Sequence, residues 1–328
     1  MKAFVTGGTG FVGANLVRLL LDRGFEVCCL VRPGSRLENL QDLEVELVRG
    51  DLIDEQLAEL MQGCQVLFHV AAHYSLWQRD RDLLYQSNVL GTRNVLAAAR
   101  KAGIERSIYT SSVAAIGIDP SGVPTTENYQ SPVEKLIGAY KQSKYWAEQE
   151  AMKAVQSGQD VVIVNPSTPI GAYDIKPTPT GEIVLRFLQR RMPSYVETGL
   201  NFVHVRDVAT GHLLALEKGK TGERYILGNE NLSLKQLLDE LSQITGLSAP
   251  ARSVPVWLPL SVAWIDEVIL TKFGKTPSIP VDGVRMSKQP MYYNPEKAIA
   301  ELGLPQTPVR TALKDAVNWF QENLSANR

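Results

Sequence analysis

Three glycines directly after the first apolar run constrain the fold more than any other feature of the chain. Gly7, Gly10 and Gly13 follow the run Lys2–Thr6, and a helical pattern begins at Phe11. Three glycines at a fixed spacing arise by chance in roughly one chain in ten of this length, so the spacing alone is weak evidence. The order of strand, glycine loop and helix is more specific, because glycines let the backbone approach a pyrophosphate and the helix start offers free N–H groups. The sequence therefore predicts a dinucleotide-binding loop with cofactor contacts from Gly7, Gly10, Phe11, Val12 and Gly13.

Short apolar runs alternate with helical patterns through the first half of the chain. This alternation predicts an α/β fold with a doubly wound parallel sheet of the Rossmann type. The expected strands are Lys2–Thr6, Glu26–Val31, Glu44–Arg49, Val66–Val70, Ser107–Ser111 and Val161–Asn165. The expected helices are Phe11–Arg23, Glu55–Met61, Arg81–Lys101 and Glu134–Gln156. Ser107–Ser111 is expected to be a central strand, and ligands gather at the carboxyl ends of such strands.

The pattern becomes less regular after Asn165. The proline-rich segment Pro166–Gly181 is expected to be a loop region that leaves the sheet. Further elements are expected at Ile183–Arg191, Asn201–Val205, Val208–Glu217, Arg224–Leu227, Leu234–Leu241 after a Ser233 cap, and Arg310–Asn323. Because 328 residues exceed the size at which single cores stop growing, two domains are expected. We assign 1–165 with 201–228 to a dinucleotide-binding domain, and 166–200 with 229–328 to a smaller, mixed substrate-binding domain.

Charge and cysteine content narrow the class of protein. The net charge of −1 gives no electrostatic case for a nucleic-acid partner. The three cysteines, Cys28, Cys29 and Cys64, lack the spacing of a metal site and are expected to be buried reduced thiols. The few residues before the glycine loop are too short for a signal peptide, which favours a cytoplasmic location.

The most apolar later stretch is Val254–Leu270. It contains Pro255, Pro259, Asp266 and Glu267, so no transmembrane segment is expected there. We expect a proline-broken segment that forms a pocket wall or a core helix, with docking on a membrane surface as the alternative. Its apolar density also suggests an apolar substrate or partner.

Arg32 bears on the choice of cofactor. An acidic residue at the end of the second strand accepts hydrogen bonds from the ribose 2′-hydroxyl of NAD, but this chain has Arg32 there, followed by Ser35 and Arg36. The positive charge favours the 2′-phosphate of NADP, with NAD as the second choice. The alternative is that Arg32 stacks on adenine or faces solvent. Asp51 and Leu52, after the third strand, are expected to flank the adenine.

The pattern Tyr-x-x-x-Lys occurs twice, at Tyr140/Lys144 and at Tyr293/Lys297. Pro295 spoils a continuous helix across the second copy. The first copy lies in a proline-free helical pattern, where a spacing of four puts both side chains on one face. A tyrosine with a pKa of about 10 is a poor acid or base at neutral pH, but a nearby ammonium and a positive nicotinamide ring favour its phenolate. We therefore expect Tyr140 to exchange a proton with a substrate oxygen during hydride transfer, and Lys144 also to hold the nicotinamide ribose.

These motifs resemble the extended form of the short-chain dehydrogenase/reductase superfamily over nearly the whole chain. The matching segments are Thr6–Gly13, Phe68–Ala72, Asn88–Thr92, Thr110–Ser112, Tyr140–Lys144 and Phe202–Ala209. The resemblance implies that Ser112 rather than Ser111 is the catalytic serine and that Asn88 has a structural or proton-relay role. It also implies that Ala71 and Ala72 pass under the cofactor.

Within the superfamily the chain is most similar to dihydroflavonol 4-reductase-like proteins, especially the bacterial hopanoid-associated sugar epimerase group. Asn165–Gly171 and Asp174–Pro179 carry this closer similarity, which adds Pro166 and Ser167 to the expected cofactor site. Nucleotide-sugar epimerases of the superfamily place Arg-Asp where this chain has Leu200-Asn201. This departure and Arg32 both favour a reductase that exchanges NADP(H) at each turnover.

The leading hypothesis is therefore an NADP-dependent reductase or dehydrogenase that acts on a carbonyl or secondary alcohol. The alternatives are a sugar or polyol epimerase linked to hopanoid metabolism and a non-catalytic NADP-binding regulator. The partners expected are a small-molecule substrate and a second copy of the chain in a homodimer built on Arg81–Lys101 and Glu134–Gln156. No metal is expected. Substrate contacts are expected from His73, Tyr74, Thr168 and His204, with Trp77, Lys176 and Tyr195 as further candidates.

Overall fold

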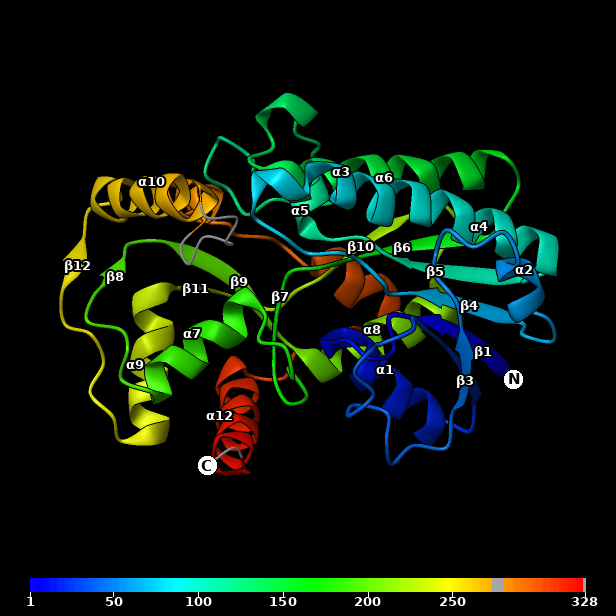
Figure 1. Cartoon of the computed structure of the whole chain (residues 1–328), viewed down its shortest axis with the longest axis horizontal. Helices are drawn as coiled ribbons and strands as arrows, with labels where there is room; N and C mark the ends of the chain where they lie inside the picture. The colour runs from blue at the N-terminus through cyan, green and yellow to red at the C-terminus, as the bar shows by residue number, and fades with distance from the viewer. Residues whose placement is uncertain (273–279, 327–328) are drawn as a thin grey trace.

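A seven-stranded parallel sheet forms the centre of the larger region of the molecule. The computed structural model describes residues 1–272 and 280–326. The strand order is β10-β6-β5-β4-β1-β2-β3, and every pairing in this sheet is parallel. The strands are β1 (Lys2–Thr6), β2 (Glu26–Val31), β3 (Glu46–Arg49), β4 (Val66–His69), β5 (Arg106–Thr110), β6 (Val161–Pro166) and β10 (Arg224–Leu227). The predicted Rossmann-like α/β fold is confirmed (Figure 1).

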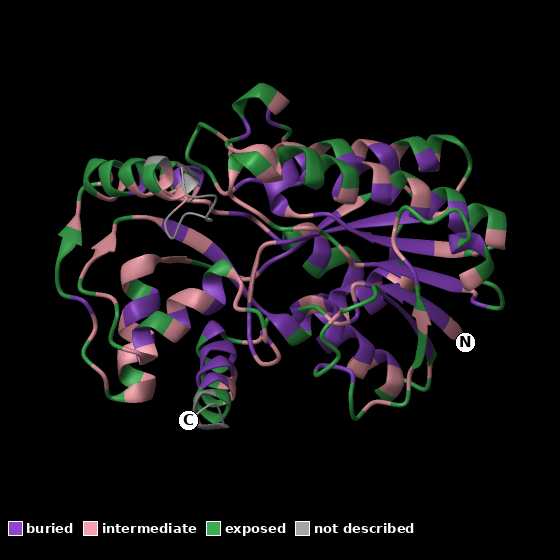
Figure 2. Cartoon of the chain, in the orientation of Figure 1, coloured by how far each residue is buried: buried purple, intermediate pink, exposed green. Residues whose placement is uncertain are grey.

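Helices cover both faces of this sheet, which explains why its inner strands are almost continuously apolar. On one face lie α1 (Phe11–Asp22) and α8 (Val205–Lys218), which pack against each other. On the other lie α2 (Leu57–Leu60), α4 (Gly91–Ala102) and α6 (Ala139–Gln156). Figure 2 shows the strands as a buried layer between the two sets of helices.

A smaller region is built from segments after β6. Its three-stranded sheet has the order β11-β9-β7, with β7 (Thr168–Ile170), β9 (Gly199–His204) and β11 (Glu230–Ser233). A further two-stranded sheet pairs β8 (Tyr195–Val196) with β12 (Ser253–Val254). The helices are α7 (Pro179–Leu188), α9 (Leu234–Thr245) and α12 (Val309–Ala326), whose buried faces share one apolar cluster. Ser233 caps α9 in a capping box, as expected.

Several expected elements differ from those observed. Arg81–Lys101 is not one α-helix but α3 (Arg81–Leu84), a π-helical turn (Tyr85–Leu90) and α4. The helix expected from Glu134 begins only at Ala139, because Gly138 has a φ of 86° that ends any earlier helix. Pro166–Gly181 is not a loop throughout, since it contains β7 and the start of α7.

The apolar stretch Val254–Leu270 also differs from the expectation. It contains a continuous helix, α10 (Trp257–Lys272), because Pro259 falls in the first turn, where no helical N–H bond is lost. The expectation of a proline-broken segment was therefore wrong. Much of the helix is exposed rather than packed in the core. The next described helix is α11 (Val281–Met286), which packs against it. Within residues 1–272 and 280–326, every helix is too short or too polar to cross a membrane.

Candidate active site

The glycine loop joins β1 to α1 at the carboxyl edge of the large sheet. Gly7 has a φ of 75°, and a Cβ at this residue would lie 2.6 Å from the backbone nitrogen of Ala71. A Cβ at Gly13 would lie 2.1 Å from the carbonyl oxygen of Gly7. Both positions therefore need glycine for the loop to close against the segment after β4. Gly10 is the N-cap of α1 and provides no side-chain cap, and the first turn has no acidic residue, so the helix start suits an anion.

The residues around the expected adenosine end follow β2 and β3. Arg32 is exposed directly after β2, and its positive charge helps to lower the pKa of His73. Arg36 instead pairs with Glu38 on the surface. Asp51 lies in the turn after β3, where its backbone N–H is bonded to Asp54. Leu52 lies beside Gly91, and its carbonyl oxygen accepts a hydrogen bond from Asn94.

Ser112 lies just beyond the carboxyl end of β5, as expected for a serine at the edge of an inner strand. It caps α5 (Val113–Ile116), and its hydroxyl oxygen accepts a hydrogen bond from the backbone N–H of Ala114 at 3.1 Å. The carbonyl oxygen of Ser112 is held by the side-chain amide of Asn165 at 3.0 Å. Ser112 is thus fixed from both sides, whereas the buried hydroxyl of Ser111 has no hydrogen-bond partner among the described residues.

Tyr140 and Lys144 lie one turn apart at the start of α6. Burial raises the pKa of Tyr140 to about 12, and a hydrogen bond with Ser112 opposes that rise. The hydroxyls of Ser112 and Tyr140 therefore lie near each other, although the two residues come from different elements. Lys144 is buried, and its ammonium donates to the carbonyl oxygen of Thr110 at 2.9 Å. Burial lowers the pKa of Lys144 to about 8.

The raised pKa of Tyr140 differs from the expectation that a nearby ammonium favours its phenolate. The protein groups alone hold the phenol in its neutral form at neutral pH. A neutral tyrosine can donate a proton, so the difference concerns the direction of proton transfer rather than the identity of the group.

Asn88 connects the segment after β4 to α6. Its side chain accepts from the backbone N–H of His73 at 2.7 Å and donates to the carbonyl oxygen of His73 at 2.9 Å. It also donates to the hydroxyl of Ser143 at 2.9 Å, which in turn donates to the carbonyl oxygen of Tyr140. Asn88 lies in the π-helical turn, a form that occurs frequently at functional sites. The contacts make Asn88 a positioning residue for the start of α6.

The structure brings one of the expected substrate residues, Tyr74, to Tyr140. The ring of Tyr74 contacts the ring of Tyr140 edge-on, with centroids 4.6 Å apart. His73 precedes it, and its buried Nε2 atom has no hydrogen-bond partner in the described part of the chain. Lys176 lies near enough to help lower the pKa of His73.

The other substrate candidates lie in different surroundings. His204 caps α8, where its Nδ1 accepts from the N–H of Arg206 and its Nε2 contacts Asp315 at 3.2 Å. Both ring nitrogens have structural partners, so we leave His204 out of the proposed substrate site. Thr168 pairs with Phe202 in the smaller sheet, and Tyr195 lies in β8. Trp77 precedes a short 3₁₀ turn and stacks with Arg79.

Comparison with known proteins places the chain in a family. The sequence profile described as "NAD dependent epimerase/dehydratase family" matches residues 3–228. This chain belongs to that family. It is 66% identical over 324 residues to "Putative dihydroflavonol 4-reductase" of Synechocystis sp., a match that covers 98% of this chain and 94% of the relative. The predicted extended short-chain dehydrogenase/reductase resemblance is confirmed, and the chain is an NAD(P)-dependent oxidoreductase.

Two further relatives cover almost the whole chain. "Sterol demethylase protein B" of Methylococcus capsulatus is 36% identical over 325 residues, which are 98% of this chain and 99% of that protein. The crystal structure of gox2253 has a TM-score of 0.87 and 46% identity, with 98% of each chain covered.

The sequence analysis did not identify the side chains that hold Ser112 against β6, which are those of Asn165, Glu148 and Arg224. Asn165 donates both to the carbonyl oxygen of Ser112 and to Glu148 at 2.8 Å. Glu148 is buried on α6 and forms an ion pair with Arg224 of β10 at 3.0 Å. The position of Asn165 at the carboxyl end of a predicted strand was the one signal that could have indicated it. Glu148 lies one turn after Lys144, but its partner is distant in sequence.

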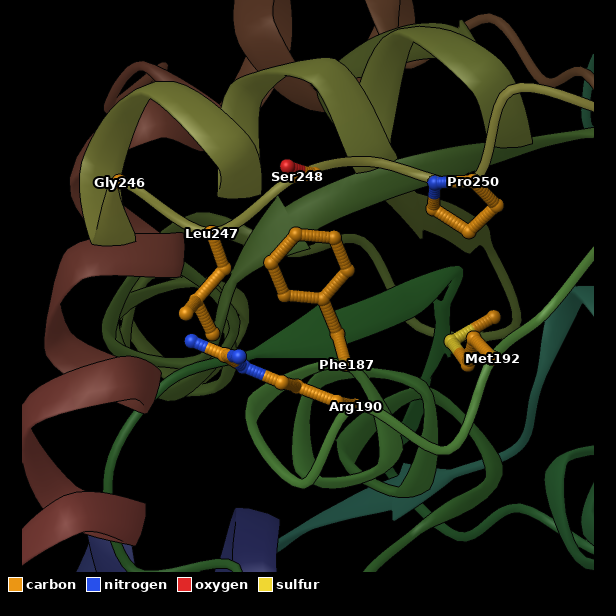
Figure 3. A pocket seen from close by; sticks show the side chains of 7 residues that line it. All are labelled: Phe187, Arg190, Met192, Gly246, Leu247, Ser248 and Pro250. Atoms are coloured by element: carbon orange, nitrogen blue, oxygen red, sulfur yellow. The ribbon is translucent and has the colours of Figure 1, made fainter.

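A hollow of about 240 Å³ lies apart from these residues, in the smaller region (Figure 3). It is lined by Phe187, Arg190, Met192, Gly246, Leu247, Ser248 and Pro250. None of the expected catalytic or cofactor residues lines it. Within the described ranges, no group of three or more His, Cys, Asp or Glu side chains is arranged to hold a metal ion.

Proposed function

We propose that this protein is an NADP(H)-dependent carbonyl reductase in which Tyr140 donates a proton to the substrate oxygen. The observation that carries the proposal is the buried ammonium of Lys144, which donates to Thr110 at the end of β5 one helical turn from Tyr140, with the Ser112 hydroxyl near the phenol. These three side chains come from the end of β5 and the start of α6. The same groups can serve the reverse oxidation of a secondary alcohol.

The residues of the glycine loop fit a dinucleotide. Gly7 and Gly13 leave no room for a Cβ, and α1 offers an uncapped N-terminus to a pyrophosphate. We propose that Gly7, Gly10, Phe11, Val12, Gly13, Arg32, Asp51, Leu52, Ala71, Ala72, Pro166 and Ser167 hold the cofactor, together with Tyr140 and Lys144. The buried hydroxyl of Ser167 has no other partner among the described residues, which fits this role. When bound, the reduced cofactor supplies a hydride.

The proton chemistry follows from the protein groups. With its pKa raised to about 12, Tyr140 is protonated at neutral pH and is ready to act as an acid. Ser112 orients the carbonyl oxygen, and that oxygen takes the proton of Tyr140 as it becomes a hydroxyl. Asn88 holds the backbone on either side of this arrangement without touching the reacting atoms.

The exposed charge of Arg32 supports NADP rather than NAD. A guanidinium at the end of β2 attracts the 2′-phosphate, whereas NAD offers only hydroxyls at that place. The test is a titration of NADPH and NADH against wild type and Arg32→Asp. We expect wild type to prefer NADPH and the variant to lose that preference by at least tenfold. Equal affinity of the wild-type protein for both cofactors contradicts the assignment.

A reductase fits better than a nucleotide-sugar epimerase because of the residues before α8. Leu200 stands where such epimerases have an arginine, and the side chain of Asn201 is used within the protein, on Asn229, Asn231 and Tyr293. The names of two relatives, a dihydroflavonol reductase and a sterol demethylase protein, support a carbonyl on an apolar ring compound as the substrate class. The family name keeps an epimerase as the second candidate.

The deciding experiment supplies NADPH and a panel of ring ketones and nucleotide sugars. A reductase consumes NADPH in a one-to-one ratio with the alcohol formed. Epimerisation of a sugar with no net use of NADPH would overturn the proposal in favour of the second candidate. Turnover at the wild-type rate in a Tyr140→Phe variant would overturn the proposed mechanism.

The remaining assignments are part of the same proposal. We propose that the region of the large sheet holds the cofactor and that the smaller region contributes the substrate site. We also propose a homodimer through α3, the π-helical turn and α6, where Leu83, Tyr85 and Trp146 are exposed. A cytoplasmic location is the setting we propose for this chemistry.

A further inference from the structure

Helix α10 exposes large apolar side chains to solvent along its length. Trp257 and Trp264 are 65% and 63% exposed, although tryptophan is among the largest apolar side chains. The other exposed apolar side chains of the helix are Leu258, Val262, Ile265 and Ile269. Figure 1 shows the helix at the edge of the molecule, where it reaches beyond the smaller sheet.

These exposed side chains share one face of the helix. At 3.6 residues per turn, positions 257, 258, 261, 262, 264, 265 and 269 fall within an arc of about 160°. We call this face, from Trp257 to Ile269, the apolar arc. Ser261 is its one polar member among those positions, and the arc carries no Asp, Glu, Lys or Arg.

Asp266 and Glu267 lie outside the arc, on the side of the helix that faces the protein. Asp266 and Glu267 are only partly exposed, and Glu267 accepts a hydrogen bond from the backbone N–H of Val281 on α11. Ala263 on this side is fully buried. A surface helix normally turns its apolar stripe inward and its charges outward. The arrangement in α10 is the reverse, which indicates that a non-aqueous surface meets the apolar arc.

The chemistry of the arc fits a lipid surface. Trp257 lies at the start of the helix and Trp264 lies two turns later, near its middle. Tryptophan is enriched where hydrocarbon meets water, because one edge of its ring is polar. Adjoining segments also carry exposed basic side chains, Arg252 before β12 and Lys288 after α11, and basic groups suit anionic headgroups.

A second copy of the chain fits the arc less well. The arc offers about half a dozen apolar side chains from a single helix at the edge of the molecule. A stable protein–protein interface uses roughly 20–30 residues on each side. A bilayer makes no comparable demand, since each side chain gains separately as it leaves water.

The helix is linked to the catalytic centre through α11. A Cβ at Gly283 would lie 3.3 Å from Leu76, which follows His73 and Tyr74. A Cβ at Gly138, two residues before Tyr140, would lie 3.1 Å from the carboxylate of Asp282. α11 thus contacts α10 on one side and the start of α6 on another.

We propose that the apolar arc of α10 docks the protein on the surface of a phospholipid bilayer, with the helix in the plane of the interface. Docking would hold the Tyr140 end of α6 beside the membrane. The proposal rests on the geometry of α10 and stands whether or not the chain is a carbonyl reductase.

The test is flotation of the full-length chain with vesicles of phosphatidylcholine and phosphatidylglycerol. The variant is Trp264→Ser with Ile265→Ser, and the matched control is Val123→Ser with Ile299→Ser, two exposed apolar residues outside α10. We expect wild type and the control to float with the vesicles and the α10 variant to lose at least tenfold in partitioning. A blue shift of tryptophan fluorescence on addition of vesicles should accompany binding in wild type.

Two results would overturn the proposal. Wild-type protein that stays with the aqueous fraction at high lipid concentration excludes a lipid surface. Loss of self-association in the α10 variant, measured by analytical ultracentrifugation without lipid, together with unchanged flotation assigns the arc to a second copy. Binding of NADPH to the α10 variant, followed by fluorescence, verifies that the variant is folded and keeps this test separate from that of the proposed reaction.

Discussion

The two copies of the Tyr-x-x-x-Lys pattern lie in different secondary structure, and their side chains have different partners. In the first copy, Tyr140 and Lys144 face the same way on α6, and Ser112 meets the tyrosine. In the second, Tyr293 lies in a β-bridge with Thr125, and Lys297 lies in a helical segment that begins after Pro295. The same letters at the same spacing therefore give two arrangements, and the local backbone decides between them.

The partners of the second copy are structural. The hydroxyl of Tyr293 donates to the carbonyl oxygens of Gly117 at 2.9 Å and Val113 at 3.3 Å. These residues end and begin α5, the short helix that Ser112 caps. Lys297 donates to Glu223 and to the carbonyl oxygen of Arg224 at the start of β10. The second tyrosine supports the element that positions Ser112, whereas the first meets Ser112 itself.

The largest expected difference between the two copies is the effect on kcat of removing the hydroxyl of each tyrosine. We expect Tyr140→Phe to lower kcat by about 10²–10⁴-fold, because the proton donor is lost. Tyr293→Phe should keep kcat within a few-fold of wild type and lower the free energy of unfolding by about 1 kcal/mol, the net value of a buried hydrogen bond. Steady-state kinetics and urea unfolding of both variants measure these effects. A Tyr293→Phe variant with the larger loss of kcat would reverse the assignment.

The pH dependence of turnover should depend on the first lysine alone. Burial lowers the pKa of Lys144 to about 8, so its positive charge is present below pH 8 and is lost as the pH rises through that value. We expect kcat/KM to fall about tenfold per pH unit above pH 8. Lys144→Arg should remove this limb, since a guanidinium stays charged.

Two lysines serve as controls for that limb. Burial also lowers the pKa of Lys141 to about 8, but Lys141 contacts the sulfur of Met291 rather than the catalytic groups. Neither Lys141→Met nor Lys297→Met should move the alkaline limb. If Lys141→Met shifted the alkaline limb, the titrating group would be Lys141 and not Lys144.

Asn88 holds the backbone N–H and carbonyl of His73, as Asn231 holds those of Tyr293 beside the second copy. The loss of Asn88 should affect catalysis through position alone. We expect Asn88→Ala to lower kcat by about ten- to a hundredfold with a smaller change in the Kd for NADPH, because the start of α6 loses its link to the His73 segment. The pH profile should keep its shape, since no titrating group is removed. Ser143→Ala removes one of the three contacts and should have a fraction of the effect; a loss equal to that of Tyr140→Phe would make Asn88 a participant in proton transfer.

The fold and the centre of the site could be predicted because their signals are local. The runs Lys2–Thr6 and Glu26–Val31 are strands as predicted, since both faces of the sheet are covered and all positions after the first are buried. Gly7, Ser112 and Tyr140 were indicated by short motifs, in which the informative residues lie within a few positions of one another.

The rest depends on contacts that no local pattern contains. Asn165 reaches the carbonyl oxygen of Ser112 across 53 positions of the sequence. One partner of the His204 ring, Asp315, lies 111 positions away in the sequence. Helix α10 shows the same limit in burial: its apolar sequence predicted a core helix, and only the packing of α11 on one side reveals which face is left to solvent.

The smallest expected effect is that of Lys297→Met, and it completes the comparison of the two copies. The ammonium of Lys297 lies 2.6 Å from the carboxylate of Glu223, whose side chain is 49% exposed, and solvent screens such a pair. We therefore expect a loss of at most about 1 kcal/mol in the free energy of unfolding and no change in kcat, measured beside the Lys144→Arg variant. If kcat fell as well, α5 and β10 would transmit a disturbance to Ser112, and the second copy would have to be counted among the positioning residues of the first.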